Sequence, residues 1–438
     1  GNNGGDGMLA AMHLLRWGKN PVVSWLGSID HAPAEAATAY HCAVQAGVSF
    51  SQHPPDTFDL CIDALFGIGM VSRDSTQPPK PRLSDWIARI NQGSAPVLAI
   101  DLPSGLLADT GVAPKETVRA HYTLSLLTLK PGLFTANGRD AAGQVWFDDL
   151  GCSSKAAVGN ADSDIPRSSG DAPSAWLLGP TRQVARPHAS HKGSYGDVAV
   201  IGGAAGMTGA ALLAATSALY GGAGRVLVAL LDGASMMVDT AQPELMFRGI
   251  DDLDLAHTTV VCGCGGGDAI RSHLSKIMSV APRVVIDADA INAIAIEAQL
   301  QHLLKARHAR RRATVLTPHP LEAARLLGVS TADVQADRIG AARQLCERFA
   351  CTVVLKGSGT VIAAPGEVPA INATGNARLA TAGTGDVLAG MIAAELARGA
   401  DAFSAACGAV YRHGASADHW SGMRGLVARD LARRCTRQ

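Results

Sequence analysis

The stretch AGTGDVLAG, residues 382–390, decides the fold because small residues lead directly into a helical pattern. The apolar residues that follow recur at helical spacing: Val387, Leu388, Met391, Ile392 and Leu396. Gly383 and Gly385 are therefore expected just before a helix N-terminus. There the free backbone N–H groups and the positive end of the helix dipole favour a phosphate, and glycines let it approach closely. The stretch predicts an anion site at the start of a helix.

Asp386 is the one carboxylate in this stretch, and two interpretations of it stay open. A carboxylate beside a phosphate site is unfavourable unless it acts on a hydroxyl group or a metal ion, which suggests a general base for phosphoryl transfer. Asp is also a preferred N-terminal capping residue. Nine residues alone do not separate the two roles.

The composition is that of a two-domain α/β enzyme that acts on a small molecule. A chain of 438 residues exceeds one ordinary core. The 38 Lys and Arg residues balance the 38 Asp and Glu residues, so the chain has no net positive charge that would attract nucleic acid or an anionic membrane. The nine cysteines include no CxxC pair, and no apolar run reaches the roughly 18 residues of a membrane span. We expect a soluble, cytoplasmic homo-oligomer whose partner is a small molecule.

The first half alternates short apolar runs with helical patterns, which predicts βαβ units and a parallel sheet. Ligands of such sheets bind beyond the carboxyl ends of the strands. The stretches expected there are the loops 1–7, 67–73 and 101–105, with a helix over 8–17 after the first. Their oxygen-bearing side chains suit a hard cation and hydroxyl-rich ligands, although the same residue types also form turns. These residues are Asn2, Asn3, Asp6, Asp63, Asp101 and Ser104.

The second half repeats the α/β pattern after a stretch of small and polar residues that we interpret as a linker. The expected domains are 1–150 and 174–438, joined by 151–173. Lys356, beside the glycines of KGSGT (356–360), is a second phosphate candidate, and no Walker loop is present. His319 is either a ligand contact or a loop residue. Asp287 and Asp289 either hold magnesium or cap the next helix.

Several motifs, in order, resemble the NAD(P)H-hydrate dehydratase family, which has a ribokinase-like fold. They are HKGSYGDVAVIGG (191–203), MTGAALLA (207–214), VIDADAINAIA (285–295), LTPHPLEAARLLG (316–328), VVLKGSGTVIA (353–363) and LATAGTGDVLAG (379–390). The first half resembles the Rossmann-like NAD(P)H-hydrate epimerase domain that precedes the dehydratase in bifunctional repair enzymes. It does so in GNNGGDG (1–7), DALFGIGM (63–70), DLPSG (101–105) and LTLKPG (127–132).

This resemblance implies a substrate and a set of site residues. The substrate is NADH or NADPH hydrated at C6 of the nicotinamide ring, and the epimerase half interconverts its R and S epimers. The dehydratase half uses ADP or ATP with Mg²⁺ to phosphorylate the ring hydroxyl, and phosphate then leaves. Asp386 becomes the base. The implied contacts to the hydrate are Ala210, Gly267, His319 and Asp386, and those to the nucleotide are Lys356, Gly357, Ser358, Gly359, Thr360 and Gly385.

The resemblance assigns the epimerase half in the same way. Asp101, with Lys130, is the candidate for proton transfer, and K⁺ is expected on Asn3, Asp63 and Ser104. The implied substrate contacts are Asn2, Asn3, Gly4, Gly5, Asp6, Gly67, Ile68, Gly69, Met70, Val71, Ser72, Arg73 and Asp101.

The chain departs from the family pattern at two places, and two other functions compete with this interpretation. The usual GPGLG is GCGGG here, at 263–267, which replaces the fixed φ of a proline with looser backbone. The chain begins inside the expected first loop, so we expect a truncated protein that lacks its first strand and is a poor epimerase. The competing functions are a ribokinase-like kinase for a vitamin-like alcohol and a non-catalytic binding protein.

Overall fold

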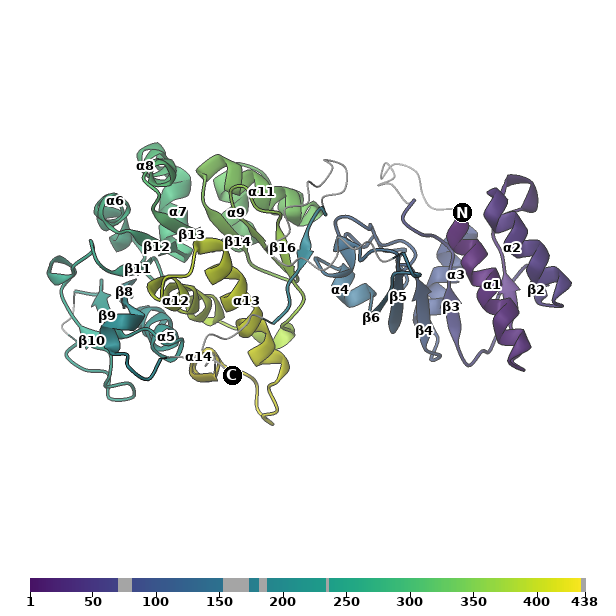
Figure 1. The fold of residues 1–438 in the computed structure, drawn as a ribbon, viewed down its shortest axis with the longest axis horizontal. Helices are drawn as coiled ribbons and strands as arrows, with labels where there is room; N and C mark the ends of the chain where they lie inside the picture. The colour runs from purple at the N-terminus through teal and green to yellow at the C-terminus, as the bar shows by residue number, and fades with distance from the viewer. Residues whose placement is uncertain (70–80, 153–172, 181–186, 234–235, 435–438) are drawn as a thin grey trace. The chain divides into compact units, whose positions relative to one another are not determined.

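A computed structural model of the chain describes residues 1–69, 81–152, 173–180, 187–233 and 236–434. The chain divides into two compact units, Gly1–Ala172 and Pro173–Gln438 (Figure 1). Each unit is an α/β structure, as the sequence predicts. Most of the expected linker, 153–172, lies outside the described residues.

The second unit is built on a ten-stranded sheet whose centre is parallel. The strand order is β10-β9-β8-β11-β12-β13-β14-β15-β16-β7, and β15 runs antiparallel to both of its neighbours. The parallel strands are β8 (Asp197–Gly202), β9 (Arg225–Leu230), β10 (Met246–Phe247), β11 (Thr259–Cys262), β12 (Arg283–Ile286), β13 (Ala313–Leu316) and β14 (Thr352–Leu355). The others are β15 (Thr360–Ala363), β16 (Ala370–Asn372) and β7 (Trp176–Leu177).

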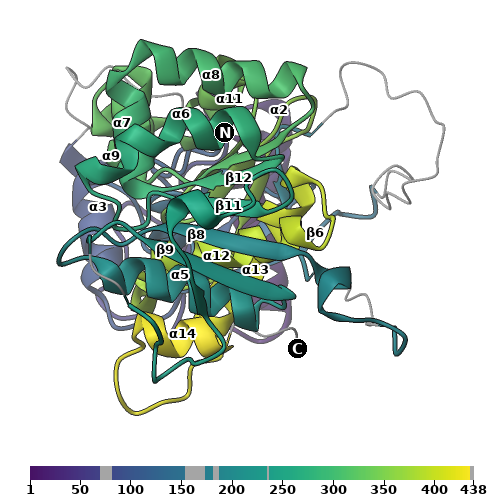
Figure 2. The same cartoon turned by 90° about the vertical axis from the view of Figure 1, so that its left-hand side faces the viewer.

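Helices cover both faces of this sheet, which explains why its central strands are apolar without alternation. On one face lie α5 (Thr208–Tyr220), α12 (Thr384–Ala397), α13 (Ala402–Asp418) and α14 (Ala428–Arg434), and the other face carries α6 to α9 and α11 (Figures 1 and 2). The bounds of this second set are α6 (Arg271–Val280), α7 (Ala288–Ile296), α8 (Ala298–Ala309), α9 (Pro320–Leu327) and α11 (Arg338–Phe349). The short helix α10 (Thr331–Ala336) lies between α9 and α11 in the chain.

The buried helix α12 is the element nearest to the centre of the second core. A Cβ on Gly390 would lie 2.0 Å from the carbonyl oxygen of Ala214, so only a glycine lets α12 approach α5 this closely. The apolar residues of the deciding stretch are buried in this core: Val387, Leu388, Met391, Ile392 and Leu396. The N-terminus of α12 is thereby fixed rigidly beside the sheet.

The first unit contains two separate parallel sheets among the residues described. One has the order β3-β4-β5-β6, and the other is the pair β1-β2. The strands are β1 (Val22–Ser24), β2 (Ser49–Ser51), β3 (Cys61–Asp63), β4 (Val97–Ile100), β5 (Tyr122–Leu126) and β6 (Gln144–Asp148). The helices are α1 (Asn2–Arg16), α2 (Ala34–Gln45), α3 (Pro81–Gln92) and α4 (Gly138–Ala141).

The prediction of a loop over residues 1–7 is wrong, because α1 already begins at Asn2. Three glycines and two asparagines disfavour a helix on their own, so tertiary packing overrides their propensity. A Cβ on Gly5 would come within 3.1 Å of the backbone of Ala36 in α2, and one on Gly7 within 2.6 Å of the Ala64 side chain. The glycines therefore allow close packing of α1 against its neighbours.

No described helix has both the length and the apolar character that a bilayer crossing requires.

Candidate functional site

The site of the second unit lies where adjacent parallel strands end. Strands β11, β12, β13 and β14 are neighbours in the sheet, so the residues that follow them meet at one edge. These residues are the loop 263–267, Asp287, the stretch 317–319 and Lys356. The first turn of α12 lies against the same place, because a Cβ on Gly385 would be 3.3 Å from Nζ of Lys356.

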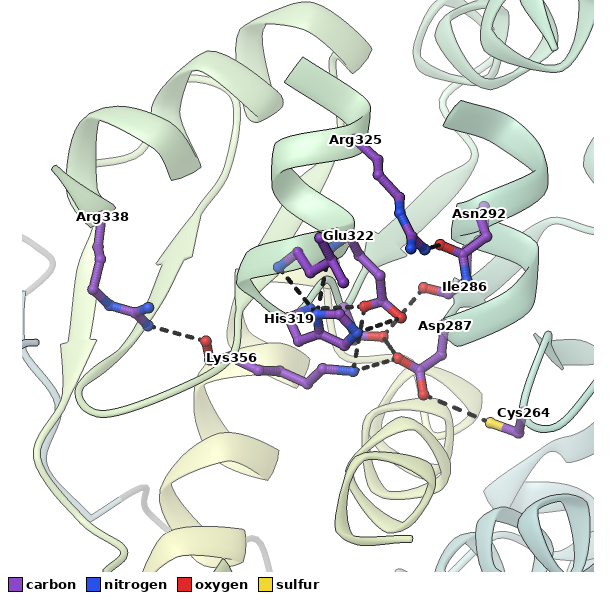
Figure 3. A network of polar contacts seen from close by, with 11 residues as sticks. Cys264, Ile286, Asp287, Asn292, His319, Glu322, Arg325, Arg338 and Lys356 are labelled. Carbon is purple, nitrogen blue, oxygen red and sulfur yellow. Dashed lines mark hydrogen bonds and ion pairs between the residues drawn. The ribbon is translucent and has the colours of Figure 1, made fainter. Parts of the chain in front are cut away.

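Asp287 is the centre of this group and is almost fully buried. Its Oδ1 accepts hydrogen bonds from Oγ1 of Thr317 and from Nζ of Lys356, both at 2.7 Å (Figure 3). Although Asp287 stands at the N-cap position of α7, its side chain makes no capping hydrogen bond. Of the two open interpretations, capping is therefore wrong for Asp287. The strand end instead holds a carboxylate in a fixed orientation.

Lys356 is the cation of the group. Its Nζ lies 2.7 Å from Asp287 and 4.0 Å from Oε2 of Glu322, and the side chain is largely buried. Burial acts to lower the pKa of this ammonium group, but the charges of Asp287 and Glu322 outweigh it and hold the pKa above its usual value. Lys356 therefore stays charged and is shared between two carboxylates. Its expected contact with a nucleotide stays a prediction.

Asp386 lies in the first turn of α12 and carries the most perturbed carboxylate of the site. The N-cap of the helix is Gly383, at φ +90°, and the helix start has no side-chain capping bond. Capping is therefore wrong for Asp386 as well, and Gly385 lies inside the first turn, not before it. Burial first, and the charge of Asp287 second, raise the pKa of Asp386 from 3.8 to about 7. Such a group accepts a proton near neutral pH.

His319 caps helix α9. Its Nδ1 accepts from the backbone N–H groups of Leu321 (3.1 Å) and Glu322 (3.3 Å), and Oε2 of Glu322 accepts from the backbone N–H of His319 at 2.8 Å. This reciprocal pair is a capping box, and Pro320 follows at the first helical position. Burial, followed by the charge of Lys356, lowers the pKa of His319. The imidazole is thus neutral, with Nε2 as its donor.

The loop 263–267 is held against α5 in spite of its departure from the family pattern. Gly263, Gly265 and Gly267 all have positive φ, and a Cβ on Gly265 would be 2.9 Å from the Cβ of Ala210. Asp289 accepts the backbone N–H of Gly267 at 2.8 Å, so this carboxylate fixes the end of the loop. Ala210 and the loop are thereby brought together. Their contact with a substrate stays a prediction.

The loop KGSGT is the turn between β14 and β15, which pair antiparallel. The fully buried Arg338 donates from Nη2 to the carbonyl oxygens of Leu355 and Lys356, at 3.1 Å each. A Cβ on Gly357, whose φ is +133°, would lie 3.0 Å from this guanidinium group. Arg338 therefore holds the backbone of the loop in place from its buried side, and Ser358 is exposed.

Four of these residues were not anticipated as part of the site: Cys264, Thr317, Glu322 and Arg338. Glu322 had a signal, because a Glu three residues after a candidate cap predicts a capping box. Thr317 directly follows strand β13, as Asp287 follows β12, which places both at the carboxyl edge of the sheet. Cys264 and Arg338 carried no local signal.

In the first unit, predicted residues line one cavity of about 690 Å³. This volume lies within the usual range for a small-molecule site. Of the predicted contacts the wall includes Asn2, Asn3, Asp6, Gly67, Ile68, Gly69 and Asp101, and it also includes Lys130. Gly4 and Gly5 are not part of this wall, and Gly5 packs on α2 instead. Met70, Val71, Ser72 and Arg73 lie outside the described residues.

Asn3 and Ser104 donate to the same carbonyl oxygen of Phe66, and Ser104 also donates to Asp63, so the three residues are linked. Both carboxylate oxygens of the buried Asp63 accept from Ser104, from its N–H at 2.8 Å and its hydroxyl at 2.6 Å. Asn3 donates to the carbonyl oxygen of Phe66 at 2.8 Å, but its own buried Oδ1 has no partner among the described residues. A buried acceptor without a donor beside a carboxylate fits a hard cation. Burial raises the pKa of Asp63, although the bonds from Ser104 oppose this.

Asp101 and Lys130 form an ion pair in the wall of the cavity. Asp101 has φ +69°, a conformation that side chains rarely adopt, and it also accepts from the backbone N–H of Leu126 at 3.1 Å. Strained backbone of this kind is frequent at functional sites. Asp6 lies near enough for the charge of Asp101, together with burial, to raise its pKa.

These features define the class of protein: a two-domain α/β enzyme with a Rossmann-like unit and a ribokinase-like unit. Family models agree, since one described as NAD(P)H-hydrate dehydratase matches residues 198–437 and one described as YjeF-related protein N-terminus matches residues 1–132. The bifunctional NAD(P)H-hydrate repair enzyme Nnr of Escherichia coli is 37% identical, over 98% of this chain and 82% of that protein. The chain belongs to the family of bifunctional NAD(P)H-hydrate repair enzymes.

Two further similar proteins match a little over half of this chain. The ADP-dependent (S)-NAD(P)H-hydrate dehydratase of Neisseria meningitidis is 44% identical, over 57% of this chain and 85% of that protein. A crystal structure of the ADP/ATP-dependent NAD(P)H-hydrate dehydratase of Bacillus subtilis, co-crystallised with ATP/Mg²⁺, is 29% identical with a TM-score of 0.49, over 59% of this chain and 92% of that one. The family models and the relative from Escherichia coli confirm the family predicted from the sequence motifs.

Proposed function

We propose that the second unit dehydrates the S epimer of hydrated NADH or NADPH at the expense of ADP or ATP, and that the first unit interconverts the R and S epimers. The observation that carries the first activity is Asp386, a half-buried carboxylate with a pKa of about 7 at the N-terminus of α12. The relatives named for both activities support the assignment to this chain.

In the proposed reaction Asp386 removes the proton of the C6 hydroxyl while the hydroxyl oxygen attacks the terminal phosphorus of the nucleotide. The bond from this phosphorus to the bridging oxygen breaks, which leaves AMP from ADP or ADP from ATP. The N–H groups of the first turn of α12, around Gly383 and Gly385, stabilise the charge on the transferred group. Bound Mg²⁺ would neutralise part of the negative charge on the phosphates of the nucleotide.

The second step releases phosphate. The lone pair of the neighbouring ring nitrogen displaces the C6 phosphate, and loss of a proton from C5 restores the double bond of the reduced nicotinamide. The charges around the site support a bound phosphate. Lys356 stays protonated between Asp287 and Glu322, which gives the site a fixed cation for a phosphate that would otherwise meet only carboxylates. Ala210, Gly267 and His319 would contact the hydrate, and Lys356 to Thr360 and Gly385 the nucleotide.

In the first unit Asp101 would move the proton, with Lys130 holding its carboxylate in place. K⁺ would be held by Asn3, Asp63 and Ser104, and the unpartnered Oδ1 of Asn3 supports this. The ion would fix the loop that follows Asp63, which forms part of the cavity wall.

A cytoplasmic setting is supported by the cysteines, all of which are free in the described part of the chain. Homo-oligomerisation stays a prediction that light scattering would test.

The deciding experiment incubates the chain with hydrated NADH, Mg²⁺ and either ADP or ATP, and follows the absorbance of the reduced nicotinamide. We expect absorbance to rise only when a nucleotide is present. The S epimer alone tests the second unit, and the R epimer tests both units in sequence. No recovery from the S epimer with either nucleotide, under conditions in which the protein is folded, would overturn the proposed dehydratase activity. A phosphorylated product that keeps its phosphate would identify a kinase instead.

A further inference from the structure

The departure from the family pattern at 263–267 places a thiol against the carboxylates of the site. Cys264 is fully buried, and its Sγ lies 3.9 Å from Oδ2 of Asp287 (Figure 3). One ligand atom from each of Cys264, Asp287 and Asp386 lies within 4.8 Å of the other two. We propose that these three residues form a binding site for a thiophilic divalent cation, such as Zn²⁺, Co²⁺ or Cd²⁺.

The donor set selects this class of ion. One sulfur and two carboxylate oxygens suit zinc and its neighbours, whereas Mg²⁺ and K⁺ prefer oxygen alone. Around a tetrahedral Zn²⁺ the ligand atoms stand about 3.5 Å apart, so side-chain rotations that close the group by about 1 Å suffice. Cys264 and Asp287 are buried and Asp386 is half-buried, which leaves the side of Asp386 open for entry and for a fourth ligand.

Hydrogen bonds from neighbouring residues fix the orientation of the Asp287 carboxylate. Its Oδ1 is occupied by Thr317 and Lys356, so Oδ2 is the oxygen directed toward Cys264. Outer hydrogen bonds of this kind orient metal ligands. The charges also match. Two carboxylates and a thiolate carry three negative charges for a divalent ion to offset, while Lys356 and Glu322 beside them carry one charge of each sign.

Binding requires the Cys264 thiol to lose its proton to the solvent buffer. Burial, and then the charges of Asp386 and Asp287, raise the pKa of the empty site's thiol well above its usual value. A bound cation reverses this balance because it supplies the counter-charge that the thiolate lacks. The ion would also occupy Asp386, so it should inhibit dehydration. This inhibition rests on the proposed function, whereas the binding does not.

The test titrates the full metal-free chain with Co²⁺ and records the near-ultraviolet charge-transfer absorption that a thiolate–Co²⁺ bond produces. We expect this band in the wild type and its loss in Cys264→Ser, with affinity at least about tenfold weaker. Cys407→Ala is the matched control, because Cys407 is a buried cysteine on α13 that is not part of the group. Thr317→Val should keep the band and weaken binding by about 10- to 100-fold.

A band of equal strength in Cys264→Ser would overturn the proposal, because another cysteine would then be the ligand. Absence of any band in the folded wild type would overturn it too. Circular dichroism of each variant shows whether it is folded. Weaker Co²⁺ binding by Asp386→Asn than by the wild type shows that Asp386 is a ligand, and unchanged binding would overturn the three-residue site. Dehydration of the S epimer is assayed separately, on protein loaded with one equivalent of Zn²⁺ and freed of excess metal. When Asp386 is a ligand, absence of inhibition would count against Asp386 as the base and leave the metal site standing, so the two failures are distinguishable.

Discussion

Asp386→Asn should make the second unit more stable at pH 8 while it removes dehydratase activity. The carboxyl has a pKa of about 7 in the folded chain against an ordinary 3.8. Between about pH 4 and pH 7 the folded state therefore binds more protons than the unfolded state, so wild-type stability falls as pH rises through this window. Asparagine carries no charge and escapes this loss. The gain in the free energy of unfolding that Asp386→Asn brings should be near zero at pH 4 and reach its full size above about pH 7.

The size of the gain follows from the difference between the two pKa values. At about 1.4 kcal/mol for each unit between them, the ceiling is about 4 kcal/mol. Asp386 is partly exposed, and Lys356 attracts the ionised form, so we expect about 1–2 kcal/mol at pH 8. Loss of the base should lower the rate of dehydration by about 10²–10⁴. Stability and activity thus change in opposite directions at one residue.

The assay is urea unfolding at pH 4.5 and pH 8, followed by hydrogen exchange and mass spectrometry in peptides from α12. Local exchange is needed because the two units can unfold separately. Asp333→Asn is the control of opposite sign. A hydrogen bond from Ser330 holds the pKa of Asp333 below its usual value, so this variant should lose stability at pH 8 and less at acidic pH. An Asp386→Asn chain that is no more stable at pH 8, or equally stabilised at pH 4.5, would refute the reasoning.

Substitutions at three further positions test separate parts of the molecule. Gly385→Ala places a Cβ 3.3 Å from Nζ of Lys356, so the KM for ADP and ATP should rise several-fold while that for the hydrate changes little in parallel saturation curves. His319→Ala should cost about 1 kcal/mol in urea unfolding through loss of the α9 cap, whereas His319→Asn should retain most of it; equal losses would argue against capping. Asp101→Asn should abolish epimerisation, measured by chromatography of the two epimers, and leave dehydration of the S epimer intact.

The sequence predicted the second unit well because its central strands are continuous apolar runs. Strands such as Arg225–Leu230 and Thr259–Cys262 contain apolar runs without alternation, because both faces of the sheet are covered. The first unit was harder. Strand β5, Tyr122–Leu126, alternates polar and apolar residues, so no continuous apolar run marks it, although it is central in its sheet. Helix α1 was expected to begin late, because contacts of its glycines with α2 and Ala64 are not visible locally.

The site was predictable in its position but not in its pairings. A run of β-branched residues that ends in Asp287 or Lys356 places each of them at the carboxyl edge of the sheet. That these two form an ion pair depends on the strand order β12-β13-β14, which sequence patterns do not give, since 69 residues separate them. The preference of Asp for helix N-termini suggested a capping role for Asp386 and Asp287, but neither side chain makes a capping hydrogen bond. Contacts with residues far away in the sequence determine where these two side chains point.

The same pairings explain how a carboxylate at a helix N-terminus becomes a base. The dipole of α12 alone would stabilise ionised Asp386 and lower its pKa, which would make it a weak base. Burial and the neighbouring charge of Asp287 act in the opposite direction, and they prevail because Lys356 is already committed to Asp287 and Glu322. If Lys356 were free to pair with Asp386 alone, the base would be neutralised. Asp287 therefore raises the proton affinity of Asp386 in two ways. It forms the ion pair with Lys356 that would otherwise be available to Asp386, and its own negative charge disfavours ionised Asp386.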